Sequence, residues 1–340
     1  MDDVRWFSPN RYGALPVPAL LRAGLAIALE GDEPARLAVS MDLQCAVAGF
    51  EYARKHRCPL AFNIADLPPW RLGGGHPDLV FELAGRIRRI PRPIGRYPQR
   101  PGYYSRARFV ARRASALWCP SYRSVEEVLN RFGCRAERVP FCYDSERFSR
   151  DRFAPVTGRS RPDEAPVVLS ISRLVPHKNH SAVLRAAARL TPRPLVRIIG
   201  QGPEAGPLRR LAVELGVGLE LNDTWVSDDD IVTAYRTATV VVCPSRFEGF
   251  GLTPMEAIAL GIPAVVSDIP THREFVDGLA RFFPLDDDAA LAAAIHAEIL
   301  APRGAVPERT APTVSPLTDL TIDACAARLL PRLQRLLQGR

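Results

Sequence analysis

The second half of the chain alternates short apolar runs with stretches of helical periodicity. The runs at 167–172, 195–199, 239–243 and 263–267 show no regular alternation of polar and apolar positions, and a further strand is expected at about 217–221. Strands of that kind are buried on both faces, which is typical of a parallel sheet covered by helices. The intervening stretches predict helices at 179–190, 207–215, 229–237 and 254–260. We therefore expect a doubly wound α/β domain here.

The first half has a similar but weaker pattern. It predicts strands at 4–7, 37–40, 60–64 and 116–119, and helices at 17–29 and 43–56. The stretch 149–166 is polar, contains proline and has no periodicity, so we place the domain boundary there. A final apolar-periodic helix is expected at about 321–338. Because about 150 residues form one domain, 340 residues predict two.

The composition fits a soluble globular protein, with 47% hydrophobic and 24% charged residues. No apolar run is long enough to predict a transmembrane helix, and the first residues lack the pattern of a secretory signal. The seven cysteines are scattered without a C-x-x-C pair, which predicts neither a zinc site nor a disulfide framework. We expect a protein of the reducing cytoplasm.

The net charge of +8 is concentrated in one stretch. Between Glu82 and Glu126 there is no acidic residue, and the arginine-rich segment 86–113 lies inside this stretch. One interpretation is a solvated face whose arginines pair elsewhere in the fold. Another is contact with an anionic membrane surface or a phosphorylated acceptor, which we favour over nucleic acid because no nucleic-acid motif accompanies the segment. The arginines are Arg86, Arg88, Arg89, Arg92, Arg96, Arg100, Arg106, Arg108, Arg112, Arg113 and Arg123.

Candidate phosphate-binding residues follow the first two strands of the second half. Ligands of open parallel sheets bind beyond the carboxyl ends of the strands. Arg173 and Lys178 lie in the loop after the first strand, just before a predicted helix, and two cations in that place suit a phosphate group. Two solvated surface cations are the alternative. Gly200 and Gly202, after the second strand, permit close backbone approach but are a weak signal.

The loop 244–256 after the valine-rich strand is the most informative. Gly249 and Gly251 leave backbone N–H groups accessible beside the positive end of the next helix. Glu248 and Glu256 are separated by seven residues and can face one cavity, and their natural partners are hydroxyl groups rather than phosphate. A ligand that carries both phosphate and hydroxyl groups, such as a nucleotide sugar, fits these residue types.

Local structure offers competing explanations for some of these acidic residues. Glu256 could complete a capping box with Thr253 as the N-cap, whereas Glu248 has no helix to cap. Metal binding would suit the clusters Asp228–Asp230 and Asp286–Asp288 by residue type. Both precede predicted helices and are more simply N-terminal caps, so no metal site is expected.

Several motifs together carry a family resemblance. They are S-R-L-x-x-x-K-N at 172–179, G-x-G-P at 200–203, P-S-x-x-E-G-F-G-L-x-x-x-E-A-x-A-x-G at 244–261, and S-D-x-x-x-x-R-E from Ser267 to Glu274. The segment 167–278 resembles the retaining glycosyltransferases of family 4, the group 1 glycosyl transferases with the GT-B fold, whose E-x7-E motif matches Glu248 and Glu256. The family's fold implies two Rossmann-like doubly wound domains facing across a cleft. We expect these at 1–155 (acceptor side) and 156–318 (donor side), with a helix at 319–340 returning to the first domain.

The resemblance also implies an activity and roles for residues. A sugar would pass with retention from a UDP-, GDP- or other nucleotide sugar to a glycan, lipid-linked or small-molecule acceptor of cell-surface synthesis, without a metal or cofactor. Glu248, Arg173 and Lys178 would be catalytic, and Glu256 would bind the ribose. Together with the scattered cysteines and the arginine-rich segment, the resemblance leads us to expect a cytoplasmic enzyme that is peripheral on the inner face of the membrane. The implied donor-binding residues are Arg173, Lys178, Gly200, Gly202, Trp225, Val226, Glu248, Gly249, Phe250, Gly251, Leu252, Thr253 and Glu256.

The first domain departs from the family pattern. A glycine-rich loop usually follows its first strand, and here only Gly13 is present. A histidine often precedes an aspartate after a central strand, and here Ala65 precedes Asp66. We assign Gly13 and Asp66 to the acceptor side. The alternative functions are a nucleotide-sugar or nucleic-acid binding protein without transfer activity, or an epimerase or phosphorylase with the same architecture.

Overall fold

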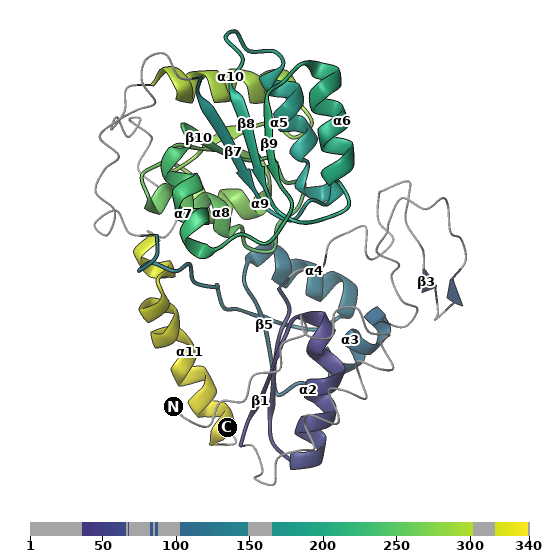
Figure 1. The fold of residues 1–340 in the computed structure, drawn as a ribbon. Coiled ribbons are helices and arrows are strands. Elements are labelled where there is room, and N and C mark those ends of the chain that lie inside the picture. The colour runs from purple at the N-terminus through teal and green to yellow at the C-terminus, as the bar shows by residue number, and fades with distance from the viewer. Residues whose placement is uncertain are drawn as a thin grey trace. The chain divides into compact units, whose positions relative to one another are not determined.

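The fold is taken from a computed structural model, which describes residues 36–65, 67, 82–83, 86–87, 103–148, 165–301 and 317–338. The chain divides into two compact units, Met1–Pro140 with Ala326–Arg340, and Phe141–Cys325 (Figure 1). The predicted strand at 4–7, the helix at 17–29 and the boundary near 155 lie outside the described residues.

The first unit contains a parallel sheet of four strands in the order β1-β2-β5-β6. The apolar run at 60–64 forms β2, all of whose residues are buried. Ser121 caps α4 by accepting from the Ser124 N–H, and Gly133 ends this helix in the left-handed conformation. The elements are β1 (Ala38–Met41), α2 (Asp42–His56), β2 (Leu60–Asn63), the short antiparallel pair β3 (Glu82–Leu83) and β4 (Arg86–Ile87), α3 (Tyr103–Ala111), β5 (Ala116–Cys119), α4 (Tyr122–Phe132) and β6 (Glu137–Arg138).

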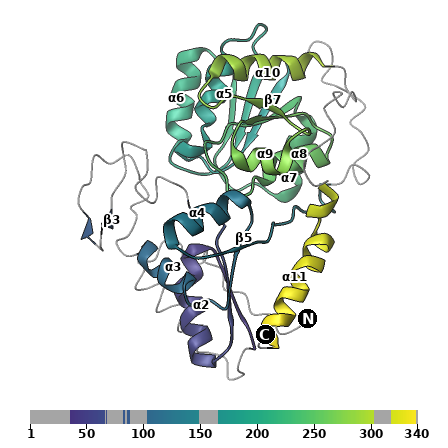
Figure 2. The same ribbon diagram turned by 180° about the vertical axis from the view of Figure 1, so that it is seen from behind.

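Helices cover both faces of this sheet. Alternate residues of β2 point to opposite faces, so Leu60 and Phe62 pack with α2, α3 and α4. On the other face, Ala61 lies in a cluster with Leu329 and Leu333 of α11 (Ile322–Leu337). Figure 2 shows α11 on the opposite side of the strands from α2. The helix predicted from periodicity at 321–338 is therefore present, and its apolar stripe covers a sheet face.

The second unit is built on six parallel strands in the order β12-β11-β10-β7-β8-β9 (Figure 1). The strand order reverses its direction between β7 and β10, which is the switch point of a doubly wound sheet. The elements are β7 (Val167–Ile171), the 3-10 turn η3 (Pro176–Lys178), α5 (His180–Ala187), β8 (Leu195–Ile199), α6 (Ala205–Leu215), β9 (Leu219–Asn222), α7 (Asp228–Thr237), β10 (Val240–Cys243), α8 (Leu252–Ala259), β11 (Ala264–Ser267), α9 (Pro270–Val276), β12 (Arg281–Phe283), α10 (Asp288–Leu300) and the 3-10 turn η4 (Leu317–Leu320).

The six strands separate two hydrophobic clusters. Val240 and Val242 of β10 face α5, α6 and α10, and Val241 faces α7, α8 and α9. Burial on both faces explains why these strands have no polar alternation. Two parallel sheets covered by helices confirm the predicted α/β class.

Helix boundaries differ from the expectation where local geometry intervenes. Asn179 has the left-handed φ of 56° and lies between η3 and α5, so the helix predicted at 179–190 begins at His180 and ends at Ala187. Ser227, rather than one of the aspartates that follow it, caps α7 by accepting from the Asp230 N–H. Asp287 caps α10, as the interpretation of Asp286–Asp288 as a cap expected.

Gly200 brings the loop after β8 against the loop after β7. Its φ is 154°, and a Cβ atom at this position would overlap the backbone carbonyl of Ser172. The Leu174 N–H donates to the Gln201 carbonyl at 2.8 Å across the same junction. Glycine is therefore needed here for both its conformation and its lack of a side chain.

We predict that Gly200→Ala lowers the free energy of unfolding by about 3 kcal/mol, because backbone must move against backbone. Urea denaturation measures the change. Gly206→Ala is the matched control, since its Cβ atom would lie 3.6 Å from an Arg210 guanidinium nitrogen, and we expect a change below about 1 kcal/mol. Equal effects of the two substitutions would contradict the close approach.

Candidate functional site

The predicted donor residues lie in loops at the carboxyl ends of neighbouring strands. The loops after β7 and β10, which flank the switch point, contain Arg173, Lys178 and Glu248. Because both strands end at the same edge of the sheet, residues distant in sequence meet there. The loop after β8, with Gly200 and Gly202, packs against the loop after β7.

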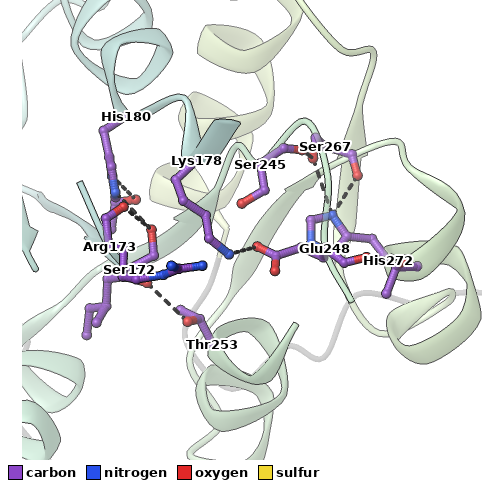
Figure 3. A network of polar contacts seen from close by, with 12 residues as sticks. Ser172, Arg173, Lys178, His180, Ser245, Glu248, Thr253, Ser267 and His272 are labelled. Atoms are coloured by element: carbon purple, nitrogen blue, oxygen red, sulfur yellow. Dashed lines mark hydrogen bonds and ion pairs between the residues drawn. The ribbon is translucent and has the colours of Figure 1, made fainter. Parts of the chain in front are cut away.

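An ion pair joins the two flanking loops. The Lys178 Nζ donates to the Glu248 Oε1 at 2.5 Å, and only 13% and 14% of the two side chains are exposed (Figure 3). Burial alone would raise the pKa of Glu248, but the Lys178 ammonium, the nearby His272 and the Ser245 hydroxyl outweigh it, so this pKa lies below its ordinary value. Glu248 is thus ionised, and Lys178 balances its charge.

Arg173 differs from Lys178 in having no ion-pair partner. It is exposed, and among the described residues no carboxylate lies within salt-bridge distance of its guanidinium. Figure 3 shows its side chain extending toward the space beside the Lys178 ammonium. An exposed arginine next to a paired lysine leaves positive charge available for an anion.

Side chains of β11 and α9 hold the backbone of the loop 244–251 in place. The Ser267 hydroxyl donates to the Ser245 carbonyl at 2.5 Å, and the Thr271 hydroxyl donates to the Glu248 carbonyl at 2.8 Å. Phe250 is buried, and its ring centroid lies 4.5 Å from that of Phe275. The loop therefore presents Glu248 from a backbone that is held in place on both sides.

Thr253 and Glu256 do not form the capping box that their spacing allows. The helix α8 begins at Leu252 with Gly251 at the N-cap, and no side chain caps it. The Thr253 hydroxyl instead donates to the Ile171 carbonyl at 3.1 Å, at the end of β7. The local explanation of Glu256 is therefore wrong, because tertiary partners take both side chains.

Glu256 is held by a tyrosine of α7. The hydroxyl of Tyr235, a fully buried residue, donates to the Glu256 Oε2 at 2.6 Å. Burial raises the pKa of Glu256 above its ordinary value, against this hydrogen bond and the charge of Arg147, which lower it. Glu256 is thus oriented by one strong donor.

A buried histidine supports the loop after β7. The two ring nitrogens of His180 lie 3.1 Å from the Ser170 hydroxyl and 2.9 Å from the Ser172 hydroxyl (Figure 3). Burial lowers the pKa of His180 to about 4, so the ring is neutral at neutral pH. It joins the first turn of α5 to the end of β7, just before Arg173.

The remaining predicted residues are placed as follows. Trp225, in the loop after β9, is 80% exposed, while Val226 packs on the core. Gly13 and Asp66 lie outside the described residues. The arginine-rich segment is described from 103 onward, where Arg106, Arg108, Arg112 and Arg113 are exposed, and the other predicted arginines up to Arg100 lie outside the described side chains.

The part of the chain that the structure describes contains neither a metal-binding cluster nor a membrane-spanning helix. There, histidine, cysteine and acidic side chains form no cluster able to hold a metal ion. None of the helices described combines the length and the apolar character needed to cross a bilayer.

Sequence reasoning missed the residues that support this site. Ser245 and Tyr235 contact the two glutamates, and Thr271 and His272 lie beside the loop that carries Glu248. The motif S-D-x-x-x-x-R-E pointed to the segment with Thr271 and His272, but it assigned no role to either. For Tyr235 no motif was available, since it is one apolar position of a helical pattern.

Comparisons with known proteins agree with this architecture. Residues 157–302 match the family model described as Glycosyl transferases group 1, so the predicted resemblance to the group 1 glycosyl transferases is confirmed over that part of the chain. Sucrose-phosphate synthase of Thermosynechococcus elongatus superposes with a TM-score of 0.72 at 17% identity, over 99% of this chain and 82% of that one. Anabaena HepE in complex with UDP and glucose superposes with a TM-score of 0.62 at 16% identity, over 98% of this chain and 83% of that one. These structures show the GT-B fold.

Two curated relatives match part of this chain. A GDP-mannose-dependent alpha-(1-6)-phosphatidylinositol monomannoside mannosyltransferase of Mycolicibacterium smegmatis is 32% identical over 142 residues, which are 38% of this chain and 37% of the relative. A D-inositol 3-phosphate glycosyltransferase of Mycobacterium bovis is 38% identical over 129 residues, 35% of this chain and 26% of the relative. The matches thus span 37% of the first relative and 26% of the second.

We predict that the contribution of Glu248 to stability is lost in acid. Because its folded pKa lies below that of the unfolded chain, the pair with Lys178 stabilises the fold above pH 4.5 and ceases to do so as pH falls through the folded value. At pH 7, Glu248→Gln should cost about 1 to 2 kcal/mol, and the gap from the wild type should close below pH 4.5 in chemical denaturation.

The exposed pair of Arg197 and Glu220 supplies the control for this measurement. Its atoms lie 2.6 Å apart, but 52% of the Glu220 side chain is exposed, so Glu220→Gln should cost less than about 1 kcal/mol at pH 7. A Glu248→Gln gap that stays constant or widens in acid would show that the carboxylate is not held by Lys178.

Proposed function

We propose that this protein is a retaining glycosyltransferase that moves a sugar from a nucleoside-diphosphate sugar to an acceptor hydroxyl without a metal ion. The observation that carries the proposal is the ion pair of Lys178 and Glu248 at the switch point between β7 and β10, with Arg173 in the same loop as Lys178. The match of residues 157–302 to the group 1 glycosyl transferases supports the same reaction class.

The two cations suit the leaving group of such a transfer. As the bond between the sugar and the diphosphate breaks, negative charge accumulates on the diphosphate oxygens, and fixed cations stabilise that charge most in the transition state. Arg173 can grip two oxygens with its planar guanidinium. Lys178 has three N–H donors, so it can bind a phosphate oxygen while one donor remains on Glu248.

Glu248 and the backbone after it suit the sugar. Ionised carboxylates accept hydrogen bonds from hydroxyl groups and repel phosphate, so Glu248 holds donor hydroxyls while the N–H groups of 249–251 lie at the start of α8. The adjacent cation and carboxylate place diphosphate and sugar side by side. The bond that joins the sugar to the diphosphate is the one that the reaction breaks.

Glu256 and Trp225 are assigned to the nucleoside. The Glu256 carboxyl, oriented by Tyr235, accepts from the ribose hydroxyls. Trp225 exposes its ring in the loop after β9, where it is available to stack on the base. Similar folds and relatives use UDP in one case and GDP-mannose in another, by their names, so the proposal is limited to a nucleoside-diphosphate sugar.

For the reaction we propose transfer on one face of the sugar. Departure of the diphosphate leaves an oxocarbenium-like sugar, and the acceptor hydroxyl attacks from the side that the diphosphate leaves, which retains the anomeric configuration. A diphosphate oxygen, made more basic as the bond breaks, accepts the acceptor proton. Arg173 and Lys178 supply the charge stabilisation that a metal ion gives in other transferases.

A phosphorylated or lipid-linked polyol is the proposed acceptor. The two curated relatives are named for inositol-containing acceptors that carry phosphate. In the first unit, Arg106, Arg108, Arg112 and Arg113 present exposed positive charge on and just after α3, which suits an anionic acceptor or membrane surface. We accordingly propose that the enzyme acts at the cytoplasmic face of a membrane.

We predict that Glu248→Gln and Lys178→Met each lower transfer from the correct donor by about 10²- to 10³-fold in kcat while the fold persists. The donor is found first by thermal shift with UDP, GDP, ADP and dTDP sugars, and transfer is then followed by release of the nucleoside diphosphate. Circular dichroism reports folding.

Arg246→Gln is the matched control for this experiment. Arg246 lies in the same loop as Glu248, but its guanidinium pairs with Asp286 at 2.8 Å on the surface, so transfer should stay within a factor of about 3. Donor binding by the wild type without any transfer would favour the binding-protein alternative over the enzyme.

A further inference from the structure

His272 is a buried histidine of α9 with no assigned role, and only 1% of the residue is exposed. Its Nδ1 lies 2.8 Å from the Ser267 carbonyl oxygen. A carbonyl only accepts hydrogen bonds, so Nδ1 must carry a proton and donate. This contact fixes the tautomer of the neutral ring, which then has its lone pair on Nε2.

The other ring nitrogen is buried without a partner. Among the residues that the structure describes, no hydrogen-bond partner reaches the Nε2 of His272. Burial, the largest influence, lowers the pKa of His272, against the Glu248 carboxylate and the Ser267 carbonyl, which raise it. The ring is therefore neutral at neutral pH, with an unprotonated Nε2 that is shielded from solvent.

This nitrogen faces the loop that carries Glu248. A Cβ atom at Gly251 would lie 3.5 Å from the Cδ2 and 3.7 Å from the Nε2 of His272. The preceding residue, Thr271, donates to the Glu248 carbonyl. In Figure 3, Glu248 lies between the Lys178 ammonium and the His272 ring.

Three charged groups act on the ring, namely Lys178, Glu248 and Asp268. Lys178 of η3 and Glu248 of the loop after β10 form one pair, at 2.5 Å. Asp268, before α9, is paired with Arg273 through two contacts of 2.7 Å. With a neutral His272, Glu248 and Asp268 thus each have one cation, and a proton on Nε2 would add a second cation beside Glu248.

We propose that His272 is a positioning residue for Glu248. When the His272 ring is neutral, the Glu248 carboxylate stays paired with Lys178. When the ring is protonated, it attracts the carboxylate away from Lys178. Opposite charges attract strongly where solvent is excluded, and within the described part of the chain no acceptor already holds Nε2. One consequence rests on the proposed function, namely that the protein with a protonated His272 binds a donor sugar more weakly.

The first experiment concerns the ring alone and needs no donor. Long-range ¹H–¹⁵N NMR spectra report the tautomer and the titration of each histidine, with His272→Asn as the assignment variant. We expect Nδ1–H at pH 7.5 and a pKa below 6.5. Glu248→Gln should lower this pKa further and Lys178→Met should raise it, because they remove the negative and the positive neighbour respectively.

Two results would overturn the proposal at this stage. One is an Nε2–H tautomer in the wild type. The other is a titration that neither variant moves. Because the tautomer is read from the wild type, it remains decisive even where the Lys178 variant fails to fold.

The second experiment measures donor affinity against pH. Calorimetric titrations with UDP-glucose and GDP-mannose, neither of which ionises in this range, run from pH 7.5 to 5.0. For whichever binds, wild-type affinity should fall about tenfold per pH unit below the His272 midpoint found by NMR. His272→Asn, whose amide can donate to the Ser267 carbonyl in place of Nδ1, should bind more weakly by up to about threefold at pH 7.5 and show no such fall.

His296→Asn is the matched control, since His296 is exposed on α10, and it should reproduce the wild-type profile. A wild-type affinity that is constant with pH, or a fall that persists in His272→Asn, would overturn the proposal. If no sugar nucleotide binds the wild type at pH 7.5, the proposed function fails, while the NMR result still decides whether His272 is coupled to Glu248.

Discussion

The ion pair between Lys178 and Glu248 depends on the order of the strands. The two residues are 70 positions apart, and their side chains meet at 2.5 Å because β7 and β10 are neighbours that end at the same sheet edge. A carboxylate so little exposed needs a compensating charge. The surrounding contacts hold the two loops in place for this pair, through the Ser267 and Thr271 hydroxyls on one side and His180 on the other.

Sequence reasoning reached the core of this site because the information is local. Strands without polar alternation predict a parallel sheet, and a parallel sheet places its ligands at the loops that follow the strands. Arg173, Lys178 and Glu248 could therefore be placed together before their contacts were known. The GT-B fold followed from motifs in the same loops, and the comparisons confirm it.

What could not be predicted are the partners that tertiary structure supplies. Thr253 and Glu256 have the spacing of a capping box, yet the end of β7 and Tyr235 take their side chains. Spacing along one helix does not reveal which neighbouring element offers a better hydrogen bond. The return of a C-terminal helix to the first domain was expected only from the family resemblance, because α11 begins about two hundred residues after β5 and no local pattern shows which sheet it covers. The acceptor residues Gly13 and Asp66 lie outside the described residues, and their assignment stays a prediction.

In the proposed reaction, the pair of Lys178 and Glu248 couples binding of the leaving diphosphate to stabilisation of the sugar. The ammonium has three donors, so a diphosphate oxygen can share it with the carboxylate rather than replace it. As charge grows on the leaving diphosphate, Lys178 is drawn toward that oxygen, and its hold on Glu248 weakens. Glu248 is then left closer to the developing positive charge of the sugar, where a carboxylate is stabilising. A second cation at His272 would oppose this shift, which is a physical reason for a buried and neutral ring behind the carboxylate.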